Sequence, residues 1–175
     1  VHDDGEFDAE VRIVNSLLRG CVAISMGGAA FVSGARASLV LEGSAVRGNS
    51  AAHGGAFYID SRAVLNITSS SSEAETALTN NTAAMIGGGI LLHEDNTRLT
   101  ISGARTRVMI ESNTAGQAGG GVFSSGGAGV LVESGAALVI QKNIATSLSG
   151  GGVYLQGEGS SLRASGNSTR VTIEN

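Results

Sequence analysis

The sequence contains no proline and no tryptophan, a single cysteine, and only four phenylalanines and two tyrosines among its 175 residues. A collagen triple helix is excluded, because proline is absent and glycine does not recur at every third position. The lone Cys21 can form no internal disulfide, and no second cysteine offers a zinc ligand beside it. With so few aromatic residues, a core has to be filled by valine, isoleucine, leucine and alanine.

Neither sign of charge dominates the sequence. The chain carries 11 basic and 15 acidic residues, for a net charge of −4, and Lys142 is its one lysine. No basic stripe is available to neutralise phosphates, so nucleic acid is not an expected partner. No apolar run approaches the roughly 20 residues that cross a bilayer, so we expect no transmembrane segment. We also expect no cofactor and no metal site. The acidic residues among the first ten positions are predicted to lie in a surface loop, and the alternative is a weak site for a hard cation. These residues are Asp3, Asp4, Glu6, Asp8 and Glu10.

Glycine is abundant, with 27 residues, and its distribution is periodic. Pairs of glycines followed by a small residue, here called the glycine boxes, recur at spacings of 27, 33, 32 and 31 residues. Such a fixed period is the signature of a repeat architecture. The five boxes are Gly27-Gly28-Ala29, Gly54-Gly55-Ala56, Gly87-Gly88-Gly89, Gly119-Gly120-Gly121 and Gly150-Gly151-Gly152.

A second motif lies upstream of each glycine box: an apolar residue, two variable positions, and then Asn-x-Ala. An inward asparagine at the same corner of every coil can bond to turn backbone and to the asparagine of the next coil. We therefore predict a ladder of side chains along the repeat axis. Its members are Cys21, which replaces asparagine in the first copy, and Asn49, Asn81, Asn113 and Asn143.

Between the two motifs the residues alternate as in β-strands, for example at Leu39-Val40-Leu41 and Leu65-Asn66-Ile67. A unit of about 31 residues has room for three short strands but not for crossover helices, so equivalent strands should stack directly. The prediction is an all-β, right-handed parallel β-helix of about five coils. A leucine-rich repeat and a β-propeller are the alternatives, although the first lacks its leucine consensus and the second needs longer repeats.

We expect residues 1–175 to form a single β-helix domain, with units at about 11–38, 39–67, 68–101, 102–132 and 133–164 and a partial unit at 165–175. Comparison of Arg107–Asn113 with Arg170–Asn175 aligns Asn175 with Ser112, one residue before the ladder position. We therefore expect the chain to be a fragment of a longer solenoid, with end-to-end stacking of copies as the alternative.

The two motifs together resemble the Gly-Gly-Ala-Ile and Phe-x-x-Asn repeats of the chlamydial polymorphic membrane proteins. The resemblance is carried by strings such as Gly87-Gly88-Gly89-Ile90 and Ile110-Glu111-Ser112-Asn113. The family usually has phenylalanine where this chain has Ile110 and its equivalents. The resemblance implies a β-helix in a surface protein, and hence an extracellular or cell-surface location.

One column of residues could form a binding surface. The position four residues after the first glycine of each box holds four of the six aromatic residues of the chain. Their neighbours are apolar and should face inward, so alternation points the column outward, as an exposed stripe for a protein or glycan. The alternative is that the column only stabilises neighbouring coils or lies under a loop. The column consists of Phe31, Tyr58, Leu91, Phe123 and Tyr154.

Catalytic chemistry is not evident. Asp60 and Asp95 lie six and eight residues after the first glycine of their boxes and should not align on adjacent coils. His2, His53 and His93 are expected in three separate loop settings.

We therefore predict a non-catalytic extracellular structural or adhesive module with a capacity for self-association into filaments, and keep a polysaccharide-processing lyase or hydrolase as the alternative. A flat Thr-x-Thr array for ice binding is missing. Sequons for N-glycosylation begin at Asn66, Asn80 and Asn167.

Overall fold

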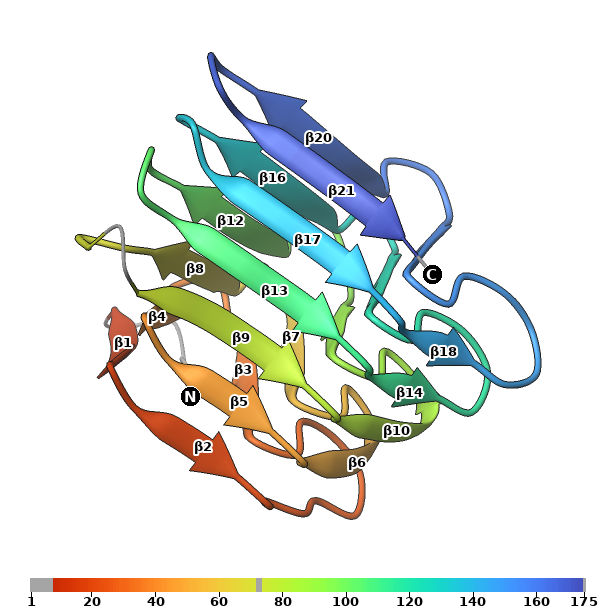
Figure 1. Cartoon of the computed structure of the whole chain (residues 1–175). Helices are drawn as coiled ribbons and strands as arrows, with labels where there is room; N and C mark the ends of the chain where they lie inside the picture. Colours follow the sequence, from red (N-terminus) through yellow and green to blue (C-terminus); the bar gives the residue numbers. More distant parts are fainter. Residues whose placement is uncertain (1–7, 72–73, 175) are drawn as a thin grey trace.

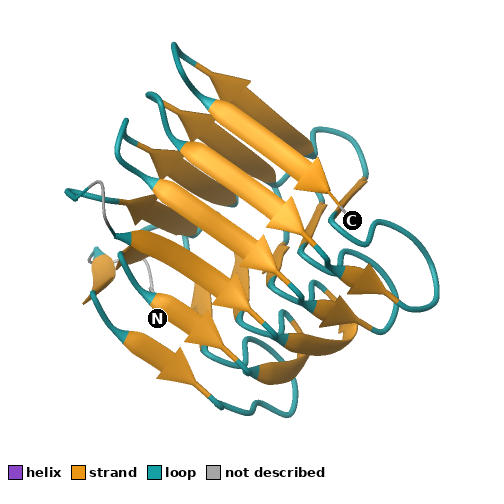
Figure 2. Ribbon diagram, viewed as in Figure 1, coloured by secondary structure: helices purple, strands orange, loops and turns teal. Residues whose placement is uncertain are grey.

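The computed structural model describes residues 8–71 and 74–174, and this part of the chain contains strands and turns but no helix (Figures 1 and 2). It forms 21 strands, and all of the ladders between them are parallel. Strands about one repeat apart lie side by side, so the chain winds into a parallel β-solenoid. The all-β solenoid of about five turns that the sequence predicts is thereby confirmed. None of the described residues form a helix that could span a membrane.

Equivalent strands of successive coils form four sheets, which we call A, B, C and D. Sheet A contains β3 (Ala30–Ser33), β7 (Phe57–Asp60), β11 (Ile90–Leu92), β15 (Val122–Ser125) and β19 (Val153–Gln156). Sheet B contains β1 (Ala9–Val14), β4 (Ala37–Glu42), β8 (Val64–Thr68), β12 (Arg98–Ser102), β16 (Gly129–Glu133) and β20 (Ser161–Ser165). Sheet C contains β2 (Leu17–Arg19), β5 (Ala45–Arg47), β9 (Glu75–Thr79), β13 (Arg107–Glu111), β17 (Ala137–Gln141) and β21 (Arg170–Glu174). Sheet D contains β6 (Ser50–His53), β10 (Thr82–Ile86), β14 (Thr114–Ala115) and β18 (Ile144–Ala145).

A complete coil therefore has four strands, taken in the order A, B, C, D, and the expectation of three per coil is wrong. The missed strands are those of sheet D. They begin directly after the ladder asparagine, within the Asn-x-Ala motif, and are as short as two residues, so they are too brief for an alternating apolar pattern. Coil 1 contributes β1 and β2, coils 2 to 5 contribute β3–β6, β7–β10, β11–β14 and β15–β18, and coil 6 contributes β19–β21.

The core lies inside the coils and is built from stacked rows of aliphatic residues. In sheet B, Leu39, Leu65 and Leu99 occupy one row of paired positions, and each is at most 1% exposed. Because every coil repeats this pattern, each inward side chain packs against the equivalent residue above and below it. The matching inward row of sheet C contains Val46, Leu78, Ile110 and Ile140.

An asparagine ladder lies at the corner between sheets C and D. In Asn81, the Oδ1 atom accepts hydrogen bonds from the backbone amide and from Nδ2 of Asn49, at 3.0 and 2.9 Å. The Nδ2 group of Asn81 in turn donates to Val46 O at 3.0 Å and to Asn113 Oδ1 at 2.9 Å. Asn113 repeats the arrangement with Leu78 and Asn143. All of these asparagines are at most 2% exposed, and each buried side-chain amide both donates and accepts hydrogen bonds.

Cys21 differs from the other predicted members of the ladder. Its backbone amide donates to Asn49 Oδ1 at 2.9 Å, but its side chain is exposed and its thiol lies 3.8 Å from Arg19 O. A thiol has no equivalent of the amide that donates in two directions, so the side-chain ladder starts at Asn49. The prediction that Cys21 is a rung is therefore wrong for its side chain.

The glycine boxes form the corner between sheets D and A. Gly87 has a φ of +68°, a left-handed conformation that β-branched and bulky residues avoid. Gly88 is required for a different reason, since a Cβ on it would lie 2.3 Å from Gly120 O in the next coil. The first glycine thus turns the chain, and the second allows the backbones of adjacent coils to touch.

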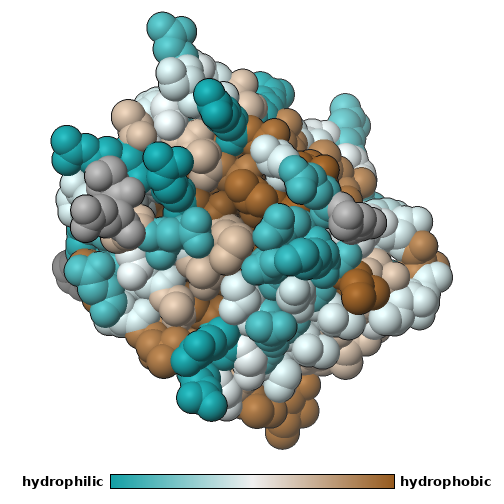
Figure 3. Space-filling view, viewed as in Figure 1, coloured by the Kyte–Doolittle hydropathy of each residue, from teal (hydrophilic) through white to brown (hydrophobic). Residues whose placement is uncertain are grey.

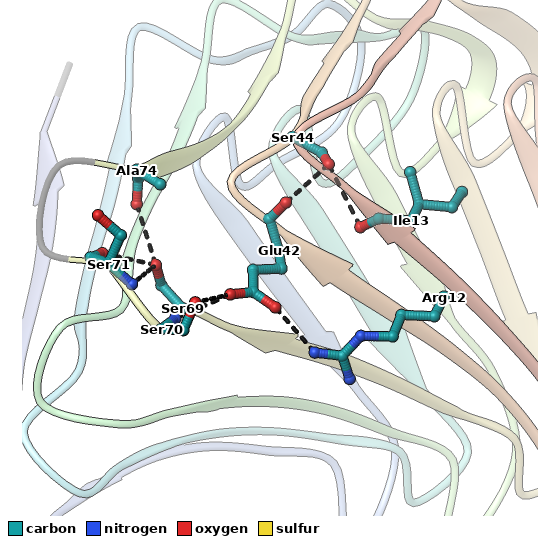
Figure 4. Close-up of polar contacts among 8 residues, drawn as sticks. All are labelled: Arg12, Ile13, Glu42, Ser44, Ser69, Ser70, Ser71 and Ala74. Atoms are coloured by element: carbon teal, nitrogen blue, oxygen red, sulfur yellow. Dashed lines mark hydrogen bonds and ion pairs between the residues drawn. The ribbon is translucent and has the colours of Figure 1, made fainter.

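Polar contacts also join coils at the end of sheet B (Figure 4). The Glu42 carboxylate bonds to Arg12 Nη2 at 2.8 Å from the coil before, and accepts bonds from the amide and hydroxyl of Ser70 in the coil after. Ser44 Oγ lies within hydrogen-bonding distance of Glu42 O and Ile13 O. The bonds from Ser70, with the Arg12 guanidinium beside them, hold the pKa of the Glu42 carboxyl below its ordinary value. A charged Glu42 therefore ties three coils together.

Candidate functional site: the outer face of sheet A

The apolar column lies on the outer face of sheet A, in the register that the sequence spacing indicates. Phe31 pairs with Tyr58, Tyr58 with Leu91, Leu91 with Phe123, and Phe123 with Tyr154. The rings of Phe31 and Tyr58 meet edge to face with centroids 5.4 Å apart, and those of Phe123 and Tyr154 stack at 5.3 Å. Both geometries are favourable for aromatic pairs, so the column stabilises neighbouring coils.

The expectation that the whole column is exposed is wrong. Leu91 is 1% exposed and Phe123 is 4% exposed, whereas Phe31, Tyr58 and Tyr154 are half-buried. Ile86 and Ala118, which each lie directly before a glycine box, pack in one cluster with Leu91 and Phe123. The column is therefore accessible mainly at its two ends, and its middle is a small apolar cluster outside the main core.

A second column, which is polar, lies beside the apolar one. It occupies the next outward position of sheet A, six residues after the first glycine of each box. Ser33 pairs with Asp60, and Ser125 pairs with Gln156. His93 directly follows the pair between Leu92 and Ile59, and so lies level with Asp60 in the adjacent coil. The polar column consists of Ser33, Asp60, His93, Ser125 and Gln156.

The sequence contained the signal for this polar column. The same six-residue spacing recurs after all five boxes, although the type of polar residue changes from box to box. Asp60 and Asp95 are indeed out of register, because Asp60 is level with His93 and Asp95 lies two residues further along. A comparison of all polar residues at one position, whatever their type, would have found the column.

A pocket of about 400 Å³ opens beside Tyr58, at the edge of both columns. Two histidines from different coils line it: His53 at the end of β6 and His93 after β11. The expectation that these histidines lie in separate loop settings is therefore wrong, while His2 falls outside the described residues. His53 Nδ1 is buried without a hydrogen-bond partner. The other lining residues are Ser25, Met26, Ile86 and Leu91.

The electrostatics of this region are negative. The pKa of the Tyr58 hydroxyl is raised, first because the residue is partly buried and then because the Asp60 and Glu94 carboxylates lie nearby. Asp60 Oδ1 accepts a hydrogen bond of 2.7 Å from the Ser61 amide and lies 3.4 Å from His93 Nδ1. Tyr58 therefore keeps its proton at neutral pH and can donate a hydrogen bond to a ligand.

Two further hollows lie elsewhere on the described surface. One of about 410 Å³ lies over sheet B and includes Arg98, Leu131 and Arg163, and one of about 540 Å³ lies at the corner that includes Arg19, Arg47 and Asn80. Two arginines line each of them. Figure 3 shows the face over sheet C, where hydrophilic and hydrophobic side chains are interspersed. Sheet A is thus the face on which an apolar and a polar column run in parallel.

The predicted glycosylation sites have different surroundings. Asn80 is exposed at the corner that precedes the ladder residue, and Asn167 is exposed in the turn between β20 and β21. Asn66 lies within β8 and is partly buried between Val40 and Thr100 of the flanking strands. Geometry therefore favours Asn80 and Asn167 over Asn66 as acceptors. Of the early acidic residues, Asp3, Asp4 and Glu6 lie outside the described residues, so the surface loop predicted for them and its alternative cation site stay predictions. Asp8 is exposed just before β1, but Glu10 lies within β1, so the loop prediction is wrong for Glu10.

Comparisons of the chain with protein-family models, with curated proteins and with solved structures give no match. The architecture described above is that of a parallel β-solenoid with coils of about 31 residues.

Proposed function

We propose that the chain is a non-catalytic structural or adhesive module of an extracellular or cell-surface β-solenoid, and that the outer face of sheet A contacts a protein or a glycan. The observation that carries the proposal is the pair of parallel columns on this face. One presents half-buried aromatic rings at Phe31, Tyr58 and Tyr154, and the other presents hydrogen-bonding groups at Asp60 and His93 among others.

The physical basis is the match between this face and an extended ligand. Coils stack about 4.8 Å apart, so equivalent side chains form a regular array along the axis. Aromatic rings supply apolar contact area with little rotamer freedom to lose, and neighbouring hydroxyl, carboxylate and amide groups can orient a bound chain. Because the residues of both columns lie in strands of sheet A or, for His93, directly after one, backbone hydrogen bonds hold the surface in place before binding.

The resemblance to the chlamydial polymorphic membrane proteins supports the proposed location. It rests on the recurrence of a glycine box and an Asn-x-Ala motif at a common period. In this chain the two motifs have separate structural roles: Asn113 and its equivalents bridge coils through side chains, and Gly88 and its equivalents allow close contact of backbones. A surface protein with the same two motifs would have the same side-chain bridges between coils and the same close contact of backbones.

Exposed apolar residues support a capacity for self-association along the axis. Among the described residues, large hydrophobic side chains with high exposure lie almost entirely in the terminal coils, Met85 being the exception. A further coil or a second copy stacked on either end would bury them. These residues are Val11, Val14, Leu17, Val22, Ile24 and Met26 at one end, and Ile144, Leu148, Leu155 and Ile173 at the other.

The adhesive proposal can be tested with the double variant Tyr58→Ser/Tyr154→Ser. We expect binding of the immobilised protein to glycan arrays or to matrix proteins to fall at least about 10-fold, while the variant stays folded at the temperature of the binding assay. Met109→Ser/Val139→Ser is a matched control, because both residues are half-buried on the outer face of sheet C. If the sheet A variant binds as well as the wild type, or if the two variants lose binding equally, the proposed surface is wrong.

The alternative function, a polysaccharide-processing enzyme, is favoured by one observation. Carboxylate oxygens of Asp60 and Glu94 lie within 4.8 Å of each other, near the separation of about 5 to 5.5 Å that retaining glycosidases use. However, Glu94 is exposed, and the 400 Å³ pocket encloses neither carboxylate. Release of reducing ends or unsaturated products from a polysaccharide panel, abolished in Asp60→Asn, would support the enzyme over the adhesive module.

A further inference from the structure

Three side chains with metal-binding atoms meet at the edge of sheet A. Asp60 ends β7 in coil 3, whereas His93 and Glu94 follow β11 in coil 4. One ligand atom from each of the three lies within 4.8 Å of the others. The site therefore joins two adjacent coils through residues 33 and 34 positions apart in the sequence.

The separation of these atoms suits an ion better than it suits a direct hydrogen bond. His93 Nδ1 lies 3.4 Å from Asp60 Oδ1, which is longer than the usual N–H···O distance of about 2.9 Å. Two ligands of a tetrahedral zinc ion, each about 2.1 Å from the metal, lie about 3.4 Å apart. Only small movements of the exposed Glu94 side chain are then needed to complete a three-residue site.

The backbone positions two of the three ligands before any ion binds. The Ser61 amide donates to Asp60 Oδ1 at 2.7 Å and fixes that carboxylate, as outer hydrogen bonds do in metal sites. Glu94 has a φ of +71°, a conformation that is uncommon for a residue other than glycine. The turn thereby places the Glu94 carboxylate close to His93, where a regular extension of β11 would have carried it away.

The local charge also favours a cation. The Asp60 and Glu94 carboxylates carry like charges and have oxygens within 4.8 Å of each other, and a cation between them would offset their repulsion.

We propose that Asp60, His93 and Glu94 bind a divalent transition-metal ion, and that Zn²⁺ is the ion that best fits the donor set. An imidazole nitrogen with two carboxylates suits zinc, whereas calcium and magnesium prefer oxygen ligands alone. Three protein ligands leave a tetrahedral position for water or for a donor group of a bound molecule. Because the ligands come from two coils, the bound ion crosslinks coil 3 and coil 4.

The test is calorimetric titration of the folded protein with Zn²⁺ and, separately, with Ca²⁺. We expect one Zn²⁺ per chain with a micromolar Kd, and Ca²⁺ binding at least about 100-fold weaker. Since the ion binds only the folded arrangement, Tm should rise by about 5 to 10 °C when Zn²⁺ is present at about 100 times its Kd. Equal affinity for the two ions would show that the imidazole is not a ligand and would overturn the proposal.

Variants separate this site from other acidic residues. His93→Gln and Asp60→Asn should each weaken Zn²⁺ binding more than about 10-fold, whereas the control Asp95→Asn should change the Kd less than about twofold. If a variant fails to fold, perturbation of the His93 ring resonances on addition of Zn²⁺ to the wild type provides the same test. Zn²⁺ binding that persists in the His93→Gln/Asp60→Asn double variant would place the ion elsewhere. The outcome is independent of the adhesive proposal, which is measured by binding of glycans and proteins.

Discussion

Asn81 Nδ2 donates a hydrogen bond of 2.9 Å to Oδ1 of Asn113, a residue 32 positions later in the sequence and one coil further along the axis. The same relationship joins Asn49 to Asn81 and Asn113 to Asn143. Each amide also bonds to the backbone of the preceding coil. These bonds are local in space and distant in sequence, so they fix which residues of successive repeats face each other.

The first prediction concerns loss of one rung. Asn113→Leu removes the acceptor for the Asn81 amide and the donor for Leu78 O, and leaves both groups buried. We expect a loss of about 3 kcal/mol or more in the free energy of unfolding, since each unsatisfied buried group costs about 1 to 3 kcal/mol. Chemical denaturation measures this change in the free energy of unfolding. Cys21→Ala, at the exposed end of the asparagine ladder, is the control and should change stability little. An unchanged denaturation midpoint for Asn113→Leu would show that the asparagine ladder does not contribute to stability.

The second prediction concerns addition of a rung. Cys21→Asn places an amide where its Nδ2 can donate to Asn49 Oδ1, beside the existing bond from the residue 21 backbone. The gain should be about 0.5 to 1.5 kcal/mol, the net value of one hydrogen bond. Cys21→Asp, which has no donor to offer, is the control. Equal stability of the two variants in thermal unfolding would contradict the predicted rung.

The third prediction concerns the glycine boxes. Gly88→Ala introduces a Cβ that would lie 2.3 Å from Gly120 O and 2.6 Å from Thr114 O, both backbone atoms that cannot yield easily. We expect destabilisation of about 3 kcal/mol or more. Gly48→Asn is the control, because no atom lies within 4 Å of the corresponding Cβ and the equivalent Asn80 already adopts a φ of +54°. Similar unfolding curves for both variants would show that close packing of backbones is unimportant here.

The fourth prediction concerns pH. The pKa of Glu42 is lower in the folded protein than in the unfolded chain, so its charged form stabilises the fold above the unfolded pKa. This contribution is lost as the pH falls through the folded pKa, below the ordinary value of 4.5. Glu42→Gln should therefore lower Tm at pH 7, and the difference from the wild type should shrink at pH 3. A difference of equal size at both pH values would mean that the charge of Glu42 is not responsible.

The fifth prediction separates the two parts of the apolar column. Phe123 is 4% exposed and packs with Leu91, so Phe123→Ser should cost about 3 kcal/mol or more, as large-to-small changes do in a core. Tyr154 is only partly buried, and Tyr154→Ser should cost less than about half as much. Equal losses in urea denaturation would indicate that the column is buried throughout.

How far the sequence predicts this structure depends on whether a feature repeats. The rung positions at Asn81 and Asn113, and the register of Tyr58 with Leu91, follow from residues that recur once per coil. The burial of Leu91 does not follow, because it depends on Ile86 and Ala118. These two residues pair at one repeated position, directly before a glycine box, but the residue type at this position changes from coil to coil. Sheet D was missed for a related reason, since strands as short as Thr114–Ala115 leave no periodic signal.

The candidate site shows the same limit. Asp60 and His93 occupy one repeated position, but the residue types differ, so similarity between the repeats does not reveal the pair. The approach of Glu94 to His93 depends on a single left-handed residue in one turn, and no other coil predicts it. Structure was needed to bring these three side chains together.

The asparagine series also has a direction. In every rung the donor belongs to the earlier coil and the acceptor to the later one, so the two faces of any coil are chemically unlike. A second molecule that continued this pattern would have to dock head to tail, because two like faces would present donors to donors or acceptors to acceptors. Head-to-tail contacts that do not close by rotation generate open fibres and not closed dimers. The orientation of one buried amide thus sets the symmetry of any assembly that this corner can support.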